Sequence, residues 1–307
     1  MKIISIIAEN WKADGGAAFG VVPKTIWGKL YPADDDNLQK ITSRCLLVDT
    51  GSSLILFDTG MGNKQDEKFF RYRYRFGTDN LFENLKYAGY SADDITDVVF
   101  THLHFDHCGG ASCWNEDGSE AIRTFPNATY HVSMAQAQWA LHPNKREAAS
   151  YLKENLQPIF EGSPLNLIEK PGPFLPQIDF RLFNGHTSGQ IIPFIHIGQQ
   201  TIVFVSDFIP SSAHLPLVYI SAYDTQPLIT LAEKEEFLQE AIEKQYILVF
   251  GHDYFNEAAT VTNKGKGFQA EKIGSIIYIK DCPSFSESYG LVSDVSSKSV
   301  LDSSKYH

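Results

Sequence analysis

The sequence predicts a four-layer α/β fold, in which two sheets pack face to face and helices cover both outer faces. Short apolar runs of strand length recur from the N-terminus to residue 250, and segments with helical spacing lie between them. The chain has 307 residues, of which 43% are hydrophobic, so it is long enough to bury a sizeable core. We therefore expect an αββα sandwich of the α/β (α+β) class, with residues 1–282 as a single domain.

The individual elements follow from local patterns along the chain. Turn residues at positions 50–53 separate two apolar runs and predict a β-hairpin. Residues 81–90 show helical spacing, and Ser91 with Asp94 is typical of a helix cap that precedes a buried strand. The expected strands are residues 3–8, 45–49, 54–58, 97–101, 129–132, 178–183, 192–197, 201–206 and 246–250, and the expected helices are residues 81–90, 133–141, 146–157 and 231–244.

Two segments do not fit this alternation. From Pro283 onward serine becomes frequent and apolar periodicity fades, so residues 283–307 are expected to form a mobile tail. Arg71, Arg73 and Arg75 alternate with aromatic residues. This pattern fits an exposed strand or amphipathic segment, or alternatively a lid over a site.

Charge and composition exclude several classes of protein. The net charge of −11 disfavours a nucleic-acid partner, because such binding depends on Lys and Arg that neutralise phosphates. No run approaches the roughly 18 apolar residues of a membrane span, and the N-terminal apolar run is too short for a signal peptide. The four cysteines lack CxxC spacing and are expected to be reduced thiols. A cytoplasmic protein that binds no membrane is the expectation.

The densest cluster of chemical groups lies at residues 102–107. His102, His104, Asp106 and His107 place three imidazoles and a carboxylate directly after the predicted strand at 97–101. These are the ligand types that zinc and similar metals prefer. A loop at a strand end can wrap several side chains around one point, whereas a strand sends alternate side chains to opposite faces. The cluster therefore predicts a metal site.

These residues match in full the HxHxDH signature of the metallo-β-lactamase superfamily, which the chain resembles. The resemblance extends over roughly residues 40 to 255 and implies the metallo-β-lactamase sandwich for the predicted four layers. An ordered set of motifs is far more specific than one short match. The further matching blocks are LFDTG at 56–60, CGG at 108–110, GHTSGQ at 185–190, FVSD at 204–207 and FGH at 250–252.

The resemblance implies a dinuclear zinc centre, although other divalent metals would also suit the ligands. One metal is expected on His102, His104 and His186, the other on Asp106, His107 and His252, and Asp207 is expected to bridge them. Two such cations lower the pKa of a shared water towards about 7. The implied reaction is attack of a metal-bridging hydroxide on a carbonyl carbon, with Asp106 as the residue that carries the proton to the leaving group.

Within the superfamily, the chain looks most like the N-acyl homoserine lactonases, which act in quorum quenching. The resemblance rests on residues 104–107, 207–216 and 15–23. It implies a hydrolase of carboxylic ester bonds that opens a small-molecule lactone, acting as a monomer or a homodimer. The residues expected to bind this substrate are Phe19, Val22, Trp27, Phe105 and His214, with His214 also expected to contribute to catalysis.

One position departs from the family pattern. Many lactonases of this group carry a tyrosine three residues after the bridging aspartate, where this chain has Pro210. His214, Tyr219 and Tyr223 are the alternatives for the missing contact to the lactone carbonyl.

Other functions remain as alternatives. An arylesterase or organophosphate hydrolase would use the same metals with a compact aromatic pocket, for which Phe19, Trp27, Phe105 and residues 69–76 are candidates. A β-lactamase would need a cationic group for the carboxylate of its substrate. A metal-bound signal receptor would bind the same ligand without turnover.

Overall fold

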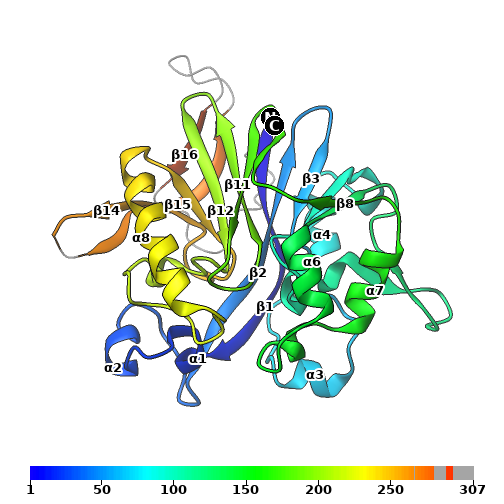
Figure 1. Cartoon of the computed structure of the whole chain (residues 1–307), viewed down its shortest axis with the longest axis horizontal. Coiled ribbons are helices and arrows are strands. Elements are labelled where there is room, and N and C mark those ends of the chain that lie inside the picture. Colours follow the sequence, from blue (N-terminus) through cyan, green and yellow to red (C-terminus); the bar gives the residue numbers. More distant parts are fainter. Residues whose placement is uncertain (266, 280–287, 293–307) are drawn as a thin grey trace.

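The computed structural model describes residues 1–265, 267–279 and 288–292, and over these it confirms the four-layer fold. Two sheets pack face to face, with helices α4 (Leu81–Tyr87), α6 (Met134–Leu141) and α7 (Lys153–Glu161) on one outer face and helix α8 (Pro227–Glu243) on the other (Figure 1). Every predicted strand is present. The predicted hairpin is confirmed as well, with Leu46 of β2 opposite Phe57 of β3.

The first sheet contains, among the described residues, six strands in the order β1-β2-β3-β4-β7-β8. Strands β1, β2 and β3 are antiparallel neighbours, whereas β4 and β7 run parallel to β3. The parallel part brings strand ends to one edge of the sheet, where the histidine motif begins. The strands are β1 Lys2–Asp14, β2 Leu38–Asp49, β3 Leu54–Phe57, β4 Asp97–Val99, β7 Thr129–Ser133 and β8 Leu165–Ile168.

The second sheet contains eight strands within the described residues, in the order β16-β15-β14-β13-β12-β11-β10-β9. Strands β12 and β13 are parallel, so their carboxyl ends also lie at one edge. A separate hairpin joins β5 Ser112–Trp114 to β6 Ala121–Arg123. The strands of the second sheet are β9 Gly172–Leu175, β10 Ile178–Phe183, β11 Gln190–Ile197, β12 Gln200–Ser206, β13 Ile247–Phe250, β14 Ala258–Asn263, β15 Phe268–Ile279 and β16 Ser288–Val292.

The expected serine-rich tail begins at residue 283. Within it, β16 pairs antiparallel with β15 as an additional strand of the sheet. The other residues of the expected tail lie outside the described residues, as does Cys282.

Some helices begin at a side chain that caps a backbone amide or at a proline in the first turn. Ser133 accepts a hydrogen bond from the Gln136 amide at the start of α6, and Pro227 occupies the first turn of α8. The α-helices are α1 Gly15–Phe19, α2 Lys24–Trp27, α3 Glu67–Arg71, α4 Leu81–Tyr87, α5 Phe105–Cys108, α6 Met134–Leu141, α7 Lys153–Glu161 and α8 Pro227–Glu243. The 3₁₀ turns are η1 Ala92–Asp94, η2 Gly109–Ala111, η3 Ala148–Ser150 and η4 Ser212–His214.

One sequence prediction about secondary structure was wrong, and one alternative for a second segment is excluded. The helix expected at residues 146–157 is broken into η3 and α7, because Tyr151 between them turns inward and donates a hydrogen bond to Glu147. The strip at residues 71–75 is not a strand. It is the end of α3 followed by a turn in which the Arg73 guanidinium stacks over Phe69 and Phe105.

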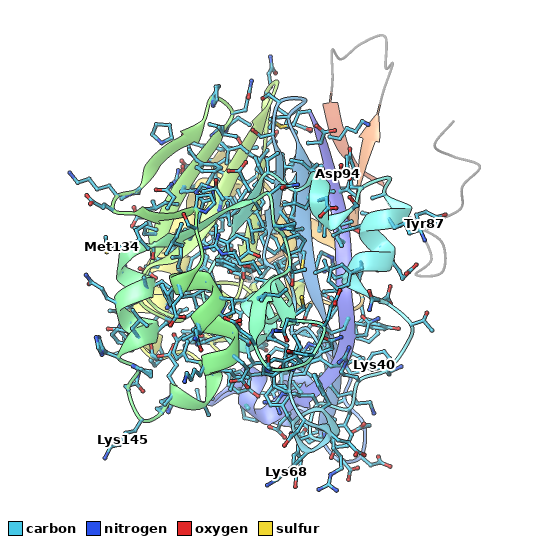
Figure 2. All side chains as sticks on the ribbon, turned by 90° about the vertical axis from the view of Figure 1, so that its right-hand side faces the viewer. Lys40, Lys68, Tyr87, Asp94, Met134 and Lys145 are labelled. Carbon is cyan, nitrogen blue, oxygen red and sulfur yellow. The ribbon has the colours of Figure 1, made fainter. Side chains whose placement is uncertain are left out.

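Three apolar cores hold the four layers together. Leu46 and Val48 of β2 face the second sheet, whereas Cys45 and Leu47 on the same strand face the helices of the first layer. This alternation is the two-residue period of a strand that is buried on both faces. A third core packs α8 on the outer face of the second sheet. Side chains fill the interior, while Lys68 and Lys145 point outward (Figure 2).

The fold also bears on membrane association. None of the helices in the described part of the chain is both long enough and apolar enough to span a bilayer.

Candidate metal centre

The histidine motif lies where the first sheet ends. The chain leaves β4, turns, and enters the short helix α5, which starts after His104. The Thr59 backbone amide and hydroxyl both donate to the His107 carbonyl oxygen, at 2.7 Å and 2.9 Å. The backbone at Gly109 and Gly110 approaches Met61 and Thr59 so closely that any Cβ would collide. The CGG block is therefore explained by close backbone packing.

The other three expected ligands come from the second sheet. His186 follows β10, Asp207 follows β12 and His252 follows β13. Each lies just beyond the carboxyl end of its strand, and the three loops face the histidine motif. The proposed centre therefore lies between the two sheets.

All seven expected ligands converge. Their ligand atoms form three overlapping groups, each within 4.8 Å: His102, His104 and His186; His102, His107 and Asp207; and Asp106, His107 and His252. Asp207 faces both ends of the cluster, since its Oδ1 lies 2.8 Å from Nε2 of His252 and its Oδ2 lies 3.4 Å from Nε2 of His186. This is the placement that a bridging carboxylate requires.

The inward-facing nitrogens are close to one another. Nδ1 of His104 lies 3.0 Å from Nε2 of His102 and 3.2 Å from Nε2 of His186, and the Nε2 atoms of His107 and His252 are 3.1 Å apart. Buried imidazoles at such distances cannot all be protonated, because their charges would repel in a medium of low polarity.

Each histidine is held from behind by a second polar group. Nε2 of His104 lies 2.8 Å from a carboxylate oxygen of Glu147. In His107, His186 and His252, the Nδ1 atom lies 2.8 Å from the outer partner of that ring. An outer N–H that donates to an oxygen leaves a lone pair on the inner nitrogen, which is the form that binds metals. The outer partners are Glu147 for His104, Asp58 for His107, Asp224 for His186, the Thr42 carbonyl for His252 and the Thr101 hydroxyl for His102.

This donor set fits divalent cations such as zinc. Five imidazoles and two carboxylates are the ligand types that Zn²⁺ accepts. The Asp207 Oδ1 atom is buried, and no contact within the described residues gives it a hydrogen bond of acceptable geometry. A buried carboxylate oxygen without a hydrogen-bond donor is costly unless a cation faces it.

Burial and neighbouring charges shift the pKa values of His102 and Glu147. Burial lowers the pKa of His102 well below its usual value, and the neighbouring His107 and His104 lower it further. Burial alone would raise the pKa of Glu147, but the hydrogen bond from His104 and those from Tyr151 and Trp139 lower it to about 2. Glu147 is therefore a carboxylate at neutral pH and can hold the His104 N–H.

The sequence analysis anticipated the seven side chains that converge here but missed most of their outer partners. Asp58 was noticed only as part of the LFDTG block. Glu147 and Asp224 lie 43 and 38 residues from the histidines that they hold, and no local pattern marks either one. Only the packing of the loops brings them to the site.

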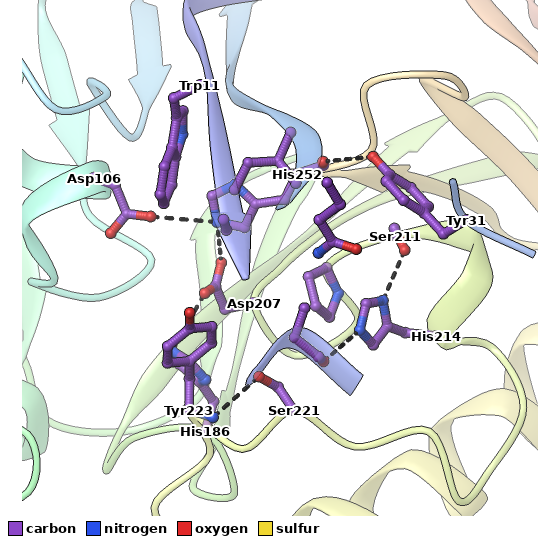
Figure 3. Close-up of a pocket in the computed structure, with 15 residues that line it drawn as sticks. Trp11, Tyr31, Asp106, His186, Asp207, Ser211, His214, Ser221, Tyr223 and His252 are labelled. Carbon is purple, nitrogen blue, oxygen red and sulfur yellow. Dashed lines mark hydrogen bonds and ion pairs between the residues drawn. The ribbon is translucent and has the colours of Figure 1, made fainter. Parts of the chain in front are cut away.

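A cavity of about 530 Å³, including its mouth, opens beside the ligands. Asp106, His186, Asp207 and His252 line one end of it (Figure 3). The remaining walls are largely apolar. They are formed by Trp11, Ala13, Ala18, Tyr31, Gln39, Ile41, Pro210, Ser211, His214, Ser221 and Tyr223.

Of the five residues expected to bind substrate, His214 is the one that lines this cavity. Phe19 is fully buried behind the wall, stacked between Trp27 at 4.9 Å and His214 at 4.3 Å between ring centroids. Val22 packs against the same cluster. Phe105 packs with Phe69 and Phe70 on the far side of Trp11.

His214 is itself held on both sides. Its Nδ1 lies 2.7 Å from the Ser211 hydroxyl, and its Nε2 lies 2.9 Å from the Ala18 carbonyl oxygen, to which it donates. Burial lowers the pKa of His214 to about 3, so the ring is neutral at physiological pH. Neither nitrogen is free to contact a substrate in this arrangement.

The two tyrosines differ in position. Tyr219 packs edge-on against Phe19 and does not line the cavity. Tyr223 lines it, and its phenol points from the loop after Ser221 toward the ligand end (Figure 3). Partial burial and the carboxylates of Asp14 and Asp106 raise the pKa of Tyr223 to about 12, so its hydroxyl is a hydrogen-bond donor at neutral pH.

A buried lysine fixes the loop that leads to Tyr223. Lys234 of α8 is 1% exposed, and its ammonium donates to the carbonyl oxygens of Pro216 at 2.9 Å, Leu217 at 3.3 Å and Tyr219 at 2.9 Å. The wall of the cavity is therefore tied to a helix of the outer layer.

Comparisons with known proteins agree with this geometry. Residues 40–252 match the family model described as the metallo-beta-lactamase superfamily. The structure of a probable metal-dependent hydrolase from Staphylococcus aureus is 30% identical, with a TM-score of 0.79, and the match covers 88% of this chain and 95% of that one. An N-acyl homoserine lactonase from Bacillus thuringiensis is 26% identical over 226 residues, which are 69% of this chain and 82% of the relative.

A more distant solved structure shares the fold. It is described as AidC, a dizinc quorum-quenching lactonase, in complex with a product. It is 24% identical with a TM-score of 0.72, and the match covers 88% of this chain and 93% of that one.

Proposed function

Because the chain belongs to the metallo-beta-lactamase superfamily, we propose that it is a two-metal hydrolase that opens the lactone ring of N-acyl homoserine lactones. The observation that carries this proposal is the convergence of all seven ligand side chains beside a largely apolar cavity. The similarity to the Bacillus thuringiensis lactonase supports the choice of substrate.

The ligand groups suggest how two cations would be held. His102, His104 and His186 would hold one, and Asp106, His107 and His252 would hold the other, with Asp207 between them. Two Zn²⁺ ions there would polarise a carbonyl oxygen and lower the pKa of a bound water towards about 7.

Asp106 is the residue proposed to move the proton. Its side chain is 12% exposed, it lines the cavity, and its Oδ2 lies 3.6 Å from Nε2 of His252. In ring opening, the water oxygen bonds to the carbonyl carbon, and the bond from that carbon to the ring oxygen breaks. Asp106 would accept the proton of the water and deliver it to the ring oxygen, which leaves as a hydroxyl.

Tyr223 is the residue proposed to orient the substrate carbonyl. Its phenol is a donor aimed at the ligand end of the cavity, whereas both nitrogens of His214 are already bonded. Tyr223 would thus supply the contact to the lactone carbonyl, because position 210 is a proline in this chain. His214 would position the wall at Ala18, with Phe19 packed behind it.

An arylesterase or phosphotriesterase activity is the second candidate. Trp11, Tyr31 and Tyr223 give the cavity three aromatic walls that would suit an aryl group. The same centre would serve either reaction, so substrate preference decides between them.

The experiment measures metal per chain and then compares turnover on a panel of substrates. We expect close to two zinc ions per chain and faster ring opening of N-acyl homoserine lactones than hydrolysis of a phosphotriester, an aryl ester or a β-lactam. A preference for any of the last three would contradict the proposal. Lactone binding without ring opening by metal-loaded protein would indicate a receptor instead.

A further inference from the structure

The floor of the cavity contains one polar side chain among apolar ones. Trp11 and Ala13 of β1 lie opposite Ile41 and Gln39 of β2 in the antiparallel register. Directly opposed residues in such a pair project from the same face of the sheet, and all four side chains line the cavity. Gln39 therefore interrupts a surface that is otherwise suited to an alkyl chain.

Gln39 has an unused hydrogen-bonding atom. The residue is 3% exposed, and its Oε1 is buried with no hydrogen-bond partner among the described residues. Buried polar atoms in folded proteins nearly always have a partner, so the Gln39 carboxamide, which lines the cavity, has hydrogen-bonding capacity left for a ligand.

The other polar side chains of the walls bond to the protein. The Tyr31 hydroxyl donates to the Lys40 carbonyl at 2.8 Å, and Ser211 bonds to His214 at 2.7 Å. Ser221 donates to the Ala17 carbonyl at 3.3 Å. Apart from the metal ligands and Tyr223, Gln39 is thus the lining residue with free hydrogen-bonding capacity within the described structure.

We infer that Gln39 is a specificity determinant that recognises a secondary amide on the substrate, an inference that rests on the proposed lactonase function. A carboxamide offers one acceptor and two donors, which complement the C=O and N–H of another amide. In an N-acyl homoserine lactone the amide is attached to the carbon next to the lactone carbonyl. With that carbonyl at the ligand end, the amide enters the cavity and forms a hydrogen bond with the carboxamide of Gln39.

The surroundings of Gln39 suit this arrangement. Ala13, the residue opposite, has a small side chain and leaves room beside the amide group. Ile41 and Ala18 supply apolar wall for the acyl chain. The site would then favour lactones that carry an acylamino group over lactones with a plain alkyl chain.

The test replaces Gln39 with Leu and, separately, with Met, which are apolar residues of similar size. The matched control is Gln200→Leu, because Gln200 also has a buried unpartnered Oε1 but does not line the cavity. The substrates are N-hexanoyl homoserine lactone and α-hexyl-γ-butyrolactone, which carries an alkyl chain on the same ring carbon and has no amide. Metal content and thermal unfolding are measured for every variant.

We expect kcat/KM for the amide-bearing lactone to fall about tenfold in both Gln39 variants, as for loss of one buried hydrogen bond. The value for α-hexyl-γ-butyrolactone should stay within about twofold, and Gln200→Leu should change neither. An equal fall in kcat/KM for both lactones, or no fall for either, would overturn the inference. Gln39 would then only bind a water molecule or support the cavity wall.

A binding measurement separates this inference from the proposed function. Calorimetry with the ring-opened product, N-hexanoyl homoserine, reports amide recognition without any turnover. If the wild-type protein opens neither lactone, the proposed function fails. Weaker product binding in the Gln39 variants would still support amide recognition, and unchanged binding would contradict it.

Discussion

The histidines of the centre are oriented by the groups behind them. A neutral imidazole has one N–H and one lone pair, so fixing the N–H fixes which nitrogen faces the metal. Carboxylates do this for His104, His107 and His186, and the Thr42 carbonyl does it for His252. These outer partners therefore help to set the geometry of the ligands.

Glu147 gives the clearest test of this arrangement. Its two oxygens accept from four donors, on His104, Tyr151, Trp139 and Asn144. Glu147→Gln would turn an NH₂ group toward some of these donors, so the His104 ring would lose its fixed orientation. We expect zinc affinity to fall about 10- to 100-fold in chelator competition.

The control for this prediction is Asp179→Asn. Asp179 also pairs with a histidine, at 2.9 Å from Nε2 of His196, but that pair is half-exposed on the surface and remote from the ligands. It should leave zinc affinity unchanged. Equal affinity of the Glu147→Gln and wild-type proteins would show that Glu147 does not position His104.

His214 should act on the shape of the cavity. His214→Ala removes a buried ring that stacks on Phe19 at 4.3 Å and leaves the Ala18 carbonyl without its donor. We expect a stability loss of about 2–3 kcal/mol and a rise in KM that exceeds any fall in turnover rate, at unchanged metal content. If instead the turnover rate falls by about 100-fold or more while KM and melting temperature stay the same, His214 contacts the transition state directly.

At the scale of elements, local sequence signals predicted the order of the strands and helices. Strand runs, turn residues and the 91–94 cap gave the element order, and the HxHxDH spacing gave the ligand loop. The sequence did not predict the register between β1 and β2. This register matters for the cavity, because a shift of one residue would turn the Gln39 side chain to the other face of the sheet. The break between η3 and α7 depends on Tyr151 reaching Glu147, a contact that helical spacing does not reveal.

Helix α8 is attached to the second sheet by an ion pair with a testable pH dependence. Both oxygens of Glu240 accept from Arg181, at 2.5 Å and 2.8 Å, and Lys244 and Tyr246 also donate to it. The hydrogen bond with Arg181 lowers the pKa of Glu240 well below the usual 4.5, against the effect of burial. The folded state therefore favours the ionised form.

The sign of the effect follows from this shift. The stabilisation is fully present above the unfolded pKa of 4.5 and is lost as the pH falls below it. We expect Glu240→Gln to be about 1 kcal/mol less stable than the wild type at pH 7, with the difference shrinking between pH 5 and pH 3.5. Urea unfolding across this range measures it. Glu243→Gln, an exposed position on the same helix, should show no such trend, and a constant difference for Glu240→Gln would refute the assignment.

At the scale of the whole molecule, the centre joins the two sheets. Residues 102–107 supply four of the proposed ligands from the first sheet, and His186, Asp207 and His252 supply three from the second. The convergence of these seven side chains could be predicted from ordered motifs, because each lies just after a strand and the fold brings these ends to one edge. The cavity floor and the outer partners come from segments distant in sequence and required the structure.

A metal pair held in this way should stabilise the packing of one sheet against the other. A ligand that binds only the folded state adds about 4 kcal/mol when its concentration is 1,000 times its Kd. Removing metal with a chelator should therefore lower the melting temperature, and zinc should restore it. Hydrogen exchange should increase first in the loops at 100–110, 206–216 and 250–255, where the ligands lie. Asp207→Asn should respond less to zinc, because this residue faces both ligand groups. If chelation removes the metal but leaves the melting temperature and loop exchange unchanged, the centre serves chemistry alone and the apolar cores hold the sheets together without it.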